Sequence, residues 1–436
     1  MTPTQSILAF AAASHVLPDD IATRTTALLG DTLTVGAAGS AAPGADGVLA
    51  AARLWGVGDD APLLGREERL PAPAAAFVNG FQIHCLEWDA VHDGAVVQAL
   101  SVVTAALHAV CARAATRGAP VTAERALVAL AVGVDIACGL GLAATEAARF
   151  HRSATAGLIG AALACARVAG TPPAAFGDVL GLAVAQAAGT MQAHVEGSQA
   201  LGLQVANASR AAVSAVDLAN AGLNGPHDAL EGPYGYFKLF DQGVIERYTA
   251  SIGAGWRLAE VGIKPWPSAR ASHATLGVLA AMIRDAGVTA AQVHAVQVYA
   301  PPLVQRLVGR PWVPEMTPAY ARLCLPFLVA LMLSEGRIDP RRFESATFVD
   351  GNLRAIGDRV KMVEVSGDSN ALAPQRIVVM LGDGRVLDRQ VAVTPGHPGN
   401  PLTAAEAEAK LRFALSLAAG PVDPRIRDNP LAWLVG

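Results

Sequence analysis

The sequence has few charged and few aromatic residues, which narrows the classes of protein it can encode. Of 436 residues, 16% are charged and 5% aromatic, while 52% are hydrophobic. This apolar content excludes an intrinsically disordered chain, because burial can offset the entropy lost on ordering. The length exceeds what one hydrophobic core usually serves, so two domains are expected.

Basic residues are not in excess. There are 33 Lys and Arg against 37 Asp and Glu, giving a formal net charge of -4. The chain therefore lacks the basic footprint of proteins that bind nucleic acid or anionic membranes. Its first residues, MTPTQS, lack the positive charges that precede the apolar part of a secretory signal. We expect a cytoplasmic protein whose partner is a small molecule.

Cysteine is scarce, and no long apolar run is free of interruption. Five scattered cysteines, none in a CxxC pair, predict buried reduced thiols rather than a disulfide framework or a zinc site. The stretch from Ala126 to Ala144 is nearly long enough to span a membrane, but Asp135 and several glycines interrupt it. We interpret it as a buried helix, suited to close helix packing.

The spacing of apolar residues divides the chain into two parts. From Thr4 to about Gly222 they recur at helical spacing, and after Trp256 alternating and Val-rich runs appear between helices. Predicted helices span residues 3–15, 19–37, 73–88, 101–115, 123–146, 153–168, 173–188, 201–223, 272–285 and 319–334. Predicted strands span residues 292–299, 359–365, 375–381 and 386–393, the last two joined by a Gly-Asp-Gly hairpin turn.

These elements predict a mostly α protein with a large all-helical domain and a smaller α+β lid domain. We place the helical domain at residues 1–255, completed by residues 400–436, and the lid at residues 256–399. A capping box at residues 403–406, TAAE, opens the last helix.

Five blocks of sequence, in order, are similar to signature segments of the MmgE/PrpD family. They are NGFQIHCLEWD at 79–89, FHRSATAG at 150–157, the segment from ANA at 206–208 to LNGP at 223–226, KPWPSARASH at 264–273, and NPLT at 400–403. This resemblance implies a helical domain built from both chain ends, a lid, a cleft between them and a homodimer. It also implies metal-free and cofactor-free chemistry α to a carboxylate, because members include 2-methylcitrate dehydratase, cis-aconitate decarboxylase and iminodisuccinate epimerase.

His151 fills the histidine position of the second block and is our first candidate for a catalytic base. Arg149 and Arg152 flank it just before a predicted helix, and together they suggest a carboxylate pocket. Nearby cations disfavour a protonated imidazole, which suits a neutral base. Without the resemblance, His151 would be read as a surface or capping histidine.

The fourth block supplies candidates from the lid. Its match implies that His273 is catalytic and that Lys264 and Arg270 bind substrate. Arg270 suits bidentate carboxylate binding. The alternatives are a structural hydrogen bond for His273 and solvated loop charges for Lys264 and Arg270.

The first block supplies acidic candidates. Glu87 and Asp89 occupy an acidic cluster of the family and are candidates for catalysis. His84, a candidate for substrate binding, shares a predicted helix face with Glu87. A role in orienting other residues is the alternative. A metal site made of these residues with His92 matches no strong spacing motif, and we predict none.

Four ionisable residues of the family are missing, at three places in the sequence. The position of one family histidine falls near Val97 in this chain. The family lysine and a second histidine are replaced by Leu201 and Gln204, and the family tyrosine is replaced by Phe327. Such groups each contribute roughly two to four decades of rate, so the losses suggest altered chemistry. Candidates to replace them are His92, Asp93, His194, Glu196 and Arg306, the last also a candidate for substrate binding.

Three functional hypotheses follow. The first is a hydro-lyase acting on a small carboxylic acid, with His151 as base and His273 as acid or opposite base. The second is an isomerase or epimerase of a dicarboxylic acid, which has no leaving group. The third is a repurposed ligand-binding protein without activity, because a fold alone does not fix function.

Overall fold

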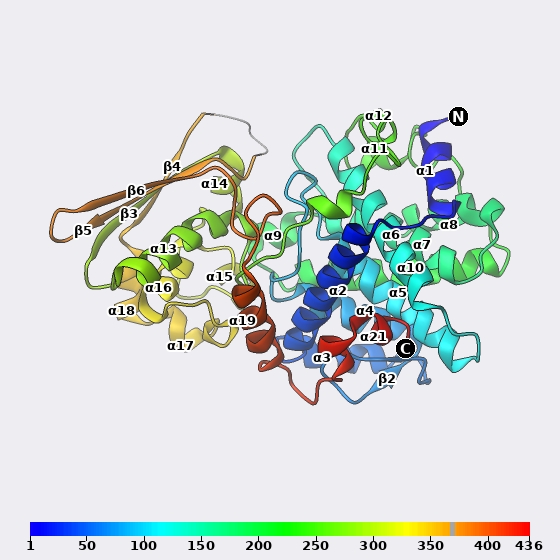
Figure 1. The fold of residues 1–436 in the computed structure, drawn as a ribbon, viewed down its shortest axis with the longest axis horizontal. Coiled ribbons are helices and arrows are strands. Elements are labelled where there is room, and N and C mark those ends of the chain that lie inside the picture. Colours follow the sequence, from blue (N-terminus) through cyan, green and yellow to red (C-terminus); the bar gives the residue numbers. More distant parts are fainter. Residues whose placement is uncertain (367–370) are drawn as a thin grey trace.

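A computed structural model describes residues 1–366 and 371–436 as two adjoining bodies of unequal size (Figure 1). The larger body is all-helical apart from a two-stranded ribbon, and the smaller is an α+β unit. One hydrophobic cluster is built from residues between Ile7 and Val261 together with Ile426, Trp433 and Leu434. A second contains residues from Ala269 to Leu381. The fold is therefore mostly α with a smaller α+β domain, as the sequence predicts.

The helical body is assembled around α4, α5, α6, α7 and α10. Its longer helices are α1 (Pro3–Ala12), α2 (Asp19–Gly39), α3 (Ala45–Arg53), α4 (Ala72–His84), α5 (Ala99–Thr116), α6 (Ala123–Ala143), α7 (Arg152–Val168), α8 (Phe176–Val184) and α10 (Ala200–Asn220). Its short elements are β1 (Ala61–Pro62), β2 (Arg69–Leu70), α9 (Gln192–Glu196), α11 (Tyr236–Leu239), α12 (Glu246–Thr249), η1 (Pro173–Ala175) and η2 (Arg257–Glu260).

Small residues allow these helices to approach closely. A Cβ on Gly160 of α7 would lie 2.2 Å from the carbonyl oxygen of Gly133 on α6. Two helices, α5 and α6, are long and apolar enough to cross a membrane by length and composition alone. Their most apolar windows are 78% and 89% buried within the protein, as in core helices. The alanine and glycine content thus serves helix packing.

The lid is a four-stranded sheet with helices packed on it. Its sheet has the order β4-β3-β5-β6, with β3 (Val293–Ala300) parallel to β4 (Val360–Glu364) and antiparallel to β5 (Gln375–Leu381), which pairs antiparallel with β6 (Val386–Val391). Its helices are η3 (Arg270–Ser272), α13 (His273–Ala286), α14 (Pro302–Val308), α15 (Pro318–Ala321), α16 (Leu325–Glu335), η4 (Pro340–Arg342), α17 (Ser345–Phe348) and α18 (Gly351–Gly357). The edge strand β6 carries exposed charges that discourage further strand pairing.

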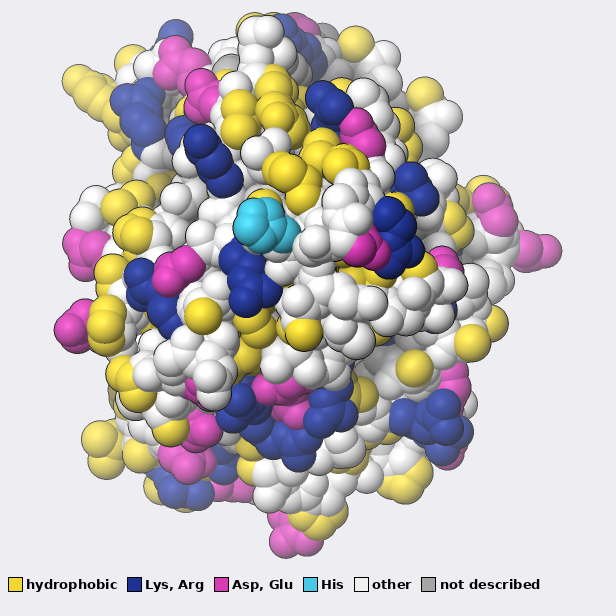
Figure 2. All heavy atoms as spheres, turned by 90° about the vertical axis from the view of Figure 1, so that its left-hand side faces the viewer, with side chains coloured by type: hydrophobic (Ala, Val, Ile, Leu, Met, Phe, Trp, Pro, Cys, Tyr) yellow, Lys and Arg dark blue, Asp and Glu magenta, His cyan; other side chains and the backbone are white. Residues whose placement is uncertain are grey.

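The outer face of the lid carries both signs of charge. Figure 2 shows Lys and Arg side chains interspersed with Asp and Glu side chains over that face, with scattered hydrophobic residues between them. A mixed surface of this kind creates no extended field of one sign. This face therefore offers no electrostatic footprint for a polyanion.

The C-terminal segment returns from the lid to the helical body. Its helices are α19 (Ala404–Leu415), α20 (Arg425–Asp428) and α21 (Pro430–Leu434). Helix α19 lies along α2, and its buried Lys410 forms an ion pair with Asp31 of α2 at 2.5 Å (Figure 1). The capping box at Thr403 and Glu406 is present. The domain limits at residues 255 and 399 stay predictions.

The main difference from the predicted elements lies beside the cleft. Helix α4 ends at His84 rather than continuing to Trp88, and Glu87 adopts a positive φ of 54°. The sequence prediction also missed α3 and α9. Apolar periodicity continues through Leu86 and Trp88, which are buried in a separate cluster, and so masks the point where the helix ends.

Candidate active site

Two adjoining cavities lie where the helical body meets the lid. The first, which we call the inner cavity, is lined by residues that include His84, Cys85, Ser198 and Arg322. The second, the outer cavity, is lined by residues that include Gln98, His151, His194 and Arg270. Glu87, Leu201 and Leu323 line both cavities. Glu87 is therefore central to this cleft.

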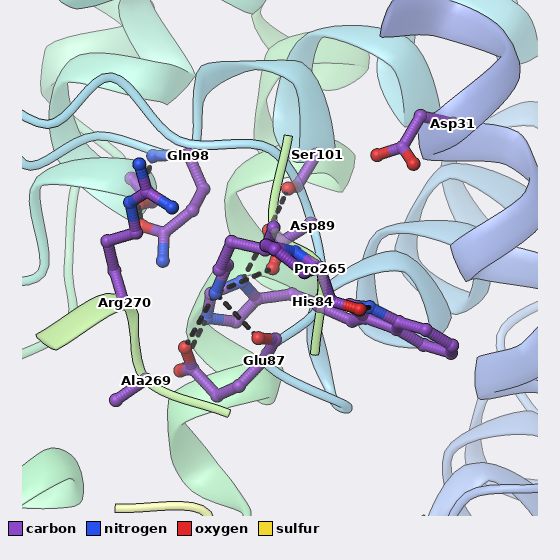
Figure 3. A network of polar contacts seen from close by, with 12 residues as sticks. Asp31, His84, Glu87, Asp89, Gln98, Ser101, Pro265, Ala269 and Arg270 are labelled. Atoms are coloured by element: carbon purple, nitrogen blue, oxygen red, sulfur yellow. Dashed lines mark hydrogen bonds and ion pairs between the residues drawn. The ribbon is translucent and has the colours of Figure 1, made fainter. Parts of the chain in front are cut away.

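His84 is held at the end of α4 by a buried carboxylate. Its Nδ1 lies 2.8 Å from Oδ2 of Asp89, which also accepts a hydrogen bond from the hydroxyl of Ser101 (Figure 3). Burial alone would lower the pKa of His84, but Asp89 and then Glu87 raise it above its ordinary value. Its Nε2 lies 3.6 Å from Oε1 of Glu87, too far for a hydrogen bond. Nε2 is thus a buried ring nitrogen without a hydrogen-bond partner among the described residues.

Glu87 is fixed by Lys264 through both its backbone and its side chain. The Nζ of Lys264 donates to the carbonyl oxygen of Glu87 at 2.6 Å and lies 3.3 Å from Oε2 of the carboxylate. A positive φ costs a residue with a side chain roughly 1–3 kcal/mol, which these contacts help to offset. Burial raises the pKa of Glu87, but Lys264 and then His84 outweigh it and lower the pKa to about 2. Glu87 is therefore a carboxylate at neutral pH.

Lys264 is not a solvated loop charge. It is fully buried and also lies 3.9 Å from Oδ1 of Asp89. Its ammonium group thus balances the two acidic residues of the first block. His84 and Glu87 meet as their spacing predicts, although a turn rather than a continuous helix brings them together.

His151 is the N-cap residue of α7 and faces the outer cavity. Its side chain is buried, and its Nδ1 has no hydrogen-bond partner among the described residues. Burial, followed by the positive charge on His84, lowers the pKa of His151 to about 3. The imidazole is neutral, as we expect from the sequence. The cause differs, because burial and His84 produce the shift rather than the neighbouring arginines.

Those arginines do not form a carboxylate pocket around His151. The side chain of Arg149 is 60% exposed and lies 3.7 Å from Glu146. Arg152 lines the outer cavity, but its guanidinium is bound by Asp241, with 2.7 Å between Nε and Oδ2 and 3.0 Å between Nη2 and Oδ1. Its charge is already paired, which leaves it a structural part of the cavity wall.

The lid candidates lie in different places. Arg270 lines the outer cavity and grips Asp93 through Nε and Nη2 at 2.9 and 3.0 Å, so Asp93 already occupies its bidentate face. His273 is fully buried, packs edge-on against Trp266 with 5.4 Å between ring centroids, and lines neither cavity. Burial and then Arg270 hold its pKa well below the usual value. The structure does not bring His273 to face His151.

Of the candidates to replace the missing residues, His194 reaches the cleft. It lines the outer cavity from α9, and burial followed by Arg310 lowers its pKa to about 4. His92 pairs with Glu260 at 3.0 Å, and Glu196 accepts a hydrogen bond from Gln192 at the surface. Arg306 is exposed on α14, outside both cavities. Asp93 also lines the outer cavity, but its carboxylate is bound by Arg270.

The three substituted positions differ in their surroundings. Leu201 lines both cavities, and near Val97 it is the next residue, Gln98, that lines the outer cavity. Val97 belongs to the helical core, and Phe327 is fully buried in the lid core against Trp312. The loss at Leu201 therefore changes the cleft wall itself, whereas Phe327 serves packing in the lid.

No group of three or more His, Cys, Asp or Glu side chains within residues 1–366 and 371–436 is arranged to hold a metal ion. His84 and Asp89 form a pair with each other, while His92 turns toward Glu260. The buried cations Lys264 and Arg322 also lie in this region. The arrangement suits proton transfer and anion binding.

Arg322 is a cleft residue that the sequence interpretation missed. It follows α15 and lines the inner cavity, where its guanidinium is buried. Nothing in the local sequence ARLCLPF distinguishes it from a surface arginine. Its position depends on a contact between remote segments of the fold. The backbone amide of Ala269 donates a hydrogen bond to the carbonyl oxygen of Arg322 at 3.1 Å.

Models of two family domains match the chain: the MmgE/PrpD N-terminal domain over residues 8–247 and the MmgE/PrpD C-terminal domain over residues 266–426. The chain belongs to the MmgE/PrpD family. The cleft described above lies where these two MmgE/PrpD segments meet, and its residues come from both. His84, Glu87 and His151 are contributed by the first, and Arg270 and Arg322 by the second.

Curated MmgE/PrpD relatives align along most of the chain. A cis-aconitate decarboxylase-like protein oryM from Aspergillus oryzae is 26% identical over 430 residues, 93% of this chain and 88% of that protein. Human cis-aconitate decarboxylase is 26% identical over 366 residues, 79% of this chain and 73% of that protein. The mouse cis-aconitate decarboxylase is 25% identical over 416 residues, 91% and 83% of the two chains. The chain is thus a divergent member of the family.

Proposed function

We propose that the protein is a cofactor-independent lyase that acts on a small carboxylic acid by moving a proton at a carbon next to a carboxylate. Its family and its cis-aconitate decarboxylase relatives support a lyase acting on a small acid. The observation that carries the proposal is the pair of buried imidazoles in the cleft, whose pKa values are shifted in opposite directions. Such a pair supplies an acid and a base at one pH.

In this proposal His151 is the base and His84 is the acid. His151 is neutral, and its Nδ1 is free to accept a proton. His84 retains its proton because Asp89 stabilises the imidazolium, and Nε2 is free to donate it. Each proton transfer of this kind contributes roughly two to four decades of rate. The role of general acid, which the sequence assigns to His273, is thus assigned to His84 in this proposal.

The fate of the leaving group separates two forms of this lyase. In a dehydration, His151 removes the proton α to a carboxylate, the electron pair forms the double bond, and His84 protonates the departing hydroxyl. In a decarboxylation, the bond to a carboxylate breaks, carbon dioxide leaves, and His84 protonates the substrate carbon that gains the electron pair, so this form needs the acid but not the base. The names of the relatives favour the second form.

The test measures turnover and solvent-deuterium exchange by NMR with 2-methylcitrate, cis-aconitate and iminodisuccinate. The wild type is compared with His151→Gln and His84→Gln, with His227→Gln as a control, because His227 is an exposed histidine paired with Asp178 at the surface. We expect product formation in the wild type and control, its loss in His84→Gln in either form, and its loss in His151→Gln if the reaction is a dehydration. Carbon dioxide release identifies decarboxylation, and inversion without a product of elimination identifies an epimerase.

No exchange and no product with any of these acids would refute the proposal and favour a ligand-binding role. Full turnover in His84→Gln would also refute it, and full dehydration by His151→Gln would refute the role of His151 as base. Cytoplasmic location and a homodimer are further parts of the proposal, tested by fractionation and by analytical ultracentrifugation.

A further inference from the structure

Arg322 is a buried cation that forms no ion pair with a carboxylate of the described residues, although the charge of Glu87 acts on it from farther away. The residue is 3% exposed, and its guanidinium carbon lies 5.1 Å from the ring centroid of Phe343, which covers one face. Its Nε and Nη2 are buried and have no hydrogen-bond partner among the described residues. Burial lowers the pKa of Arg322, and the group nonetheless remains charged, as a guanidinium does in proteins.

Other buried arginines of this chain show what Arg322 lacks. Arg152 is bound by Asp241 at 2.7 Å, Arg257 by Asp135 at 3.3 Å and Arg270 by Asp93 at 2.9 Å. A buried ion without a partner costs several kcal/mol, so proteins seldom keep one unless a ligand completes the site. The contrast therefore indicates that the partner of Arg322 is not among the described residues of the chain.

The inner cavity shows where that partner binds. Arg322 lines it together with His84, Cys85 and Glu87. Burial raises the pKa of the Cys85 thiol to about 12, which keeps it uncharged, and the carboxylate of Glu87 is already paired with Lys264. Arg322, whose Nε and Nη2 have no partner among the described residues, thus lines the same cavity as His84. The guanidinium fork of Arg322 matches the geometry of a carboxylate.

We propose that Arg322 anchors a carboxylate of the substrate in the inner cavity. This inference rests on the proposed function and makes it more specific: the group held by Arg322 is a carboxylate that survives the reaction, placed beside the Nε2 proton of His84. The substrate then carries at least two carboxylates, one bound by Arg322 and one at the reacting carbon. Leu201 lines both cavities and would form an apolar contact with the middle of the substrate.

The test uses tricarballylate, a saturated tricarboxylate that has no hydroxyl or double bond to react, and butyrate as a monocarboxylate. Binding is measured by isothermal titration calorimetry to the wild type, Arg322→Gln, Arg322→Lys and, as a control, Arg149→Gln, which removes an exposed arginine. We expect tricarballylate to bind the wild type and the control with equal affinity. Arg322→Gln should weaken binding roughly 10- to 100-fold, because a charge-assisted bidentate pair is lost.

Arg322→Lys keeps the charge without the fork, so its affinity should lie between those of the wild type and Arg322→Gln. Butyrate binding should differ little among the four proteins. The melting temperature without ligand should not fall in Arg322→Gln, since the variant removes an unpaired buried charge. Loss of tricarballylate binding by Arg322→Gln with an unchanged fold in circular dichroism supports the subsite even if no acid is turned over.

Equal tricarballylate affinity in the wild type and Arg322→Gln would overturn the inference, as would the absence of binding to the wild type. Neither result depends on turnover. Failure of the lyase proposal and failure of this subsite are therefore distinguishable.

Discussion

The rings of His84 and His151 lie with 5.1 Å between their centroids and an interplanar angle of 39°. They come from the end of α4 and the start of α7, and both are buried. At this distance a charge on one ring disfavours a charge on the other. Asp89 decides which ring keeps the proton, because of the two rings it forms a hydrogen bond only with that of His84.

The first prediction concerns the pH dependence of turnover. The pKa of His84 is raised above 6.5, so its acid form is present at lower pH and is lost as the pH rises through the shifted value. Asp89→Asn should move this alkaline limb of the kcat profile to lower pH, because the carboxylate that raises the pKa is gone. Rate profiles between pH 5.5 and about 9 measure the shift.

A surface variant provides the comparison. Asp178 forms a similar carboxylate-histidine pair with His227 at 3.0 Å, but the side chain of His227 is 74% exposed. Asp178→Asn should leave the profile unchanged. An alkaline limb at the same pH in the wild type and Asp89→Asn would show that His84 is not the group that limits the rate.

The second prediction concerns the division of roles in the cleft. For a dehydration, His151→Gln should lower kcat by roughly 10²- to 10⁴-fold, because the base that removes the α proton is lost. His194→Gln, in the same cavity, should lower kcat less. Arg310 donates to the carbonyl oxygen of His194, and the imidazole of His194 forms part of the cavity wall. Equal losses in the two variants would assign the base role to neither histidine alone. Single-turnover kinetics separate these effects from product release.

Much of the fold is predictable from local sequence patterns, because the burial of one helix face or one strand face leaves a clear period. The strand Gln375–Leu381 and the helix opening at Thr403 begin where the sequence predicts. The end of α4 is not predictable in this way. There, Lys264 stabilises the left-handed turn at Glu87 from 177 residues away, and no local pattern records that contact.

The site follows the same rule. His84, Glu87 and His151 are found from their motif positions, whereas the pairing of Arg152 with Asp241 and the burial of Arg322 depend on distant segments. An arginine beside a histidine in sequence suggests an anion pocket, but an internal carboxylate can occupy the arginine first. His273 matches its motif and yet packs against Trp266 and lines neither cavity. Sequence proximity alone thus does not show which charges remain free for a ligand.

The third prediction concerns stability at acidic pH. Burial lowers the pKa of His108 to about 4, so between pH 6.5 and 4 the unfolded chain binds one more proton at this residue. The free energy of unfolding should therefore fall as the pH drops, by about 1.4 kcal/mol per pH unit for each such histidine. His151 and His194 contribute with the same sign, while His84, with a raised pKa, partly offsets them.

His108 isolates this effect because it lies away from the cleft, stacked on Trp433 with 3.7 Å between ring centroids and bound to the carbonyl oxygen of Leu434. In His108→Gln the overall stability should fall and its slope with pH should become shallower. Urea unfolding at pH 5, 6 and 7 measures both quantities. A slope equal to that of the wild type would mean that the imidazole is protonated in the folded protein.

The fourth prediction concerns the contact that positions α4. A Cβ on Gly39 of α2 would lie 1.8 Å from the carbonyl oxygen of Gln82, two residues before His84. Gly39→Ala must therefore push α4 away and should destabilise the fold by about 3 kcal/mol or more, as overpacking against a backbone does. Gly30→Ala in the same helix has its nearest neighbour, Cγ of Pro430, at 3.7 Å. This control should be stabilised by roughly 0.5–1 kcal/mol through helix propensity alone.

Because α4 carries His84, the clash in Gly39→Ala should also disturb the pair with Asp89. Turnover should then fall under conditions in which the variant is still folded, and Gly30→Ala should keep full activity. Denaturant unfolding and kcat measured on the same samples test both parts. If the Gly39→Ala variant folds with unchanged stability, then the Cβ of residue 39 does not clash with the carbonyl oxygen of Gln82, and α2 and α4 must lie farther apart than described. The position assigned to His84 would then have to be revised.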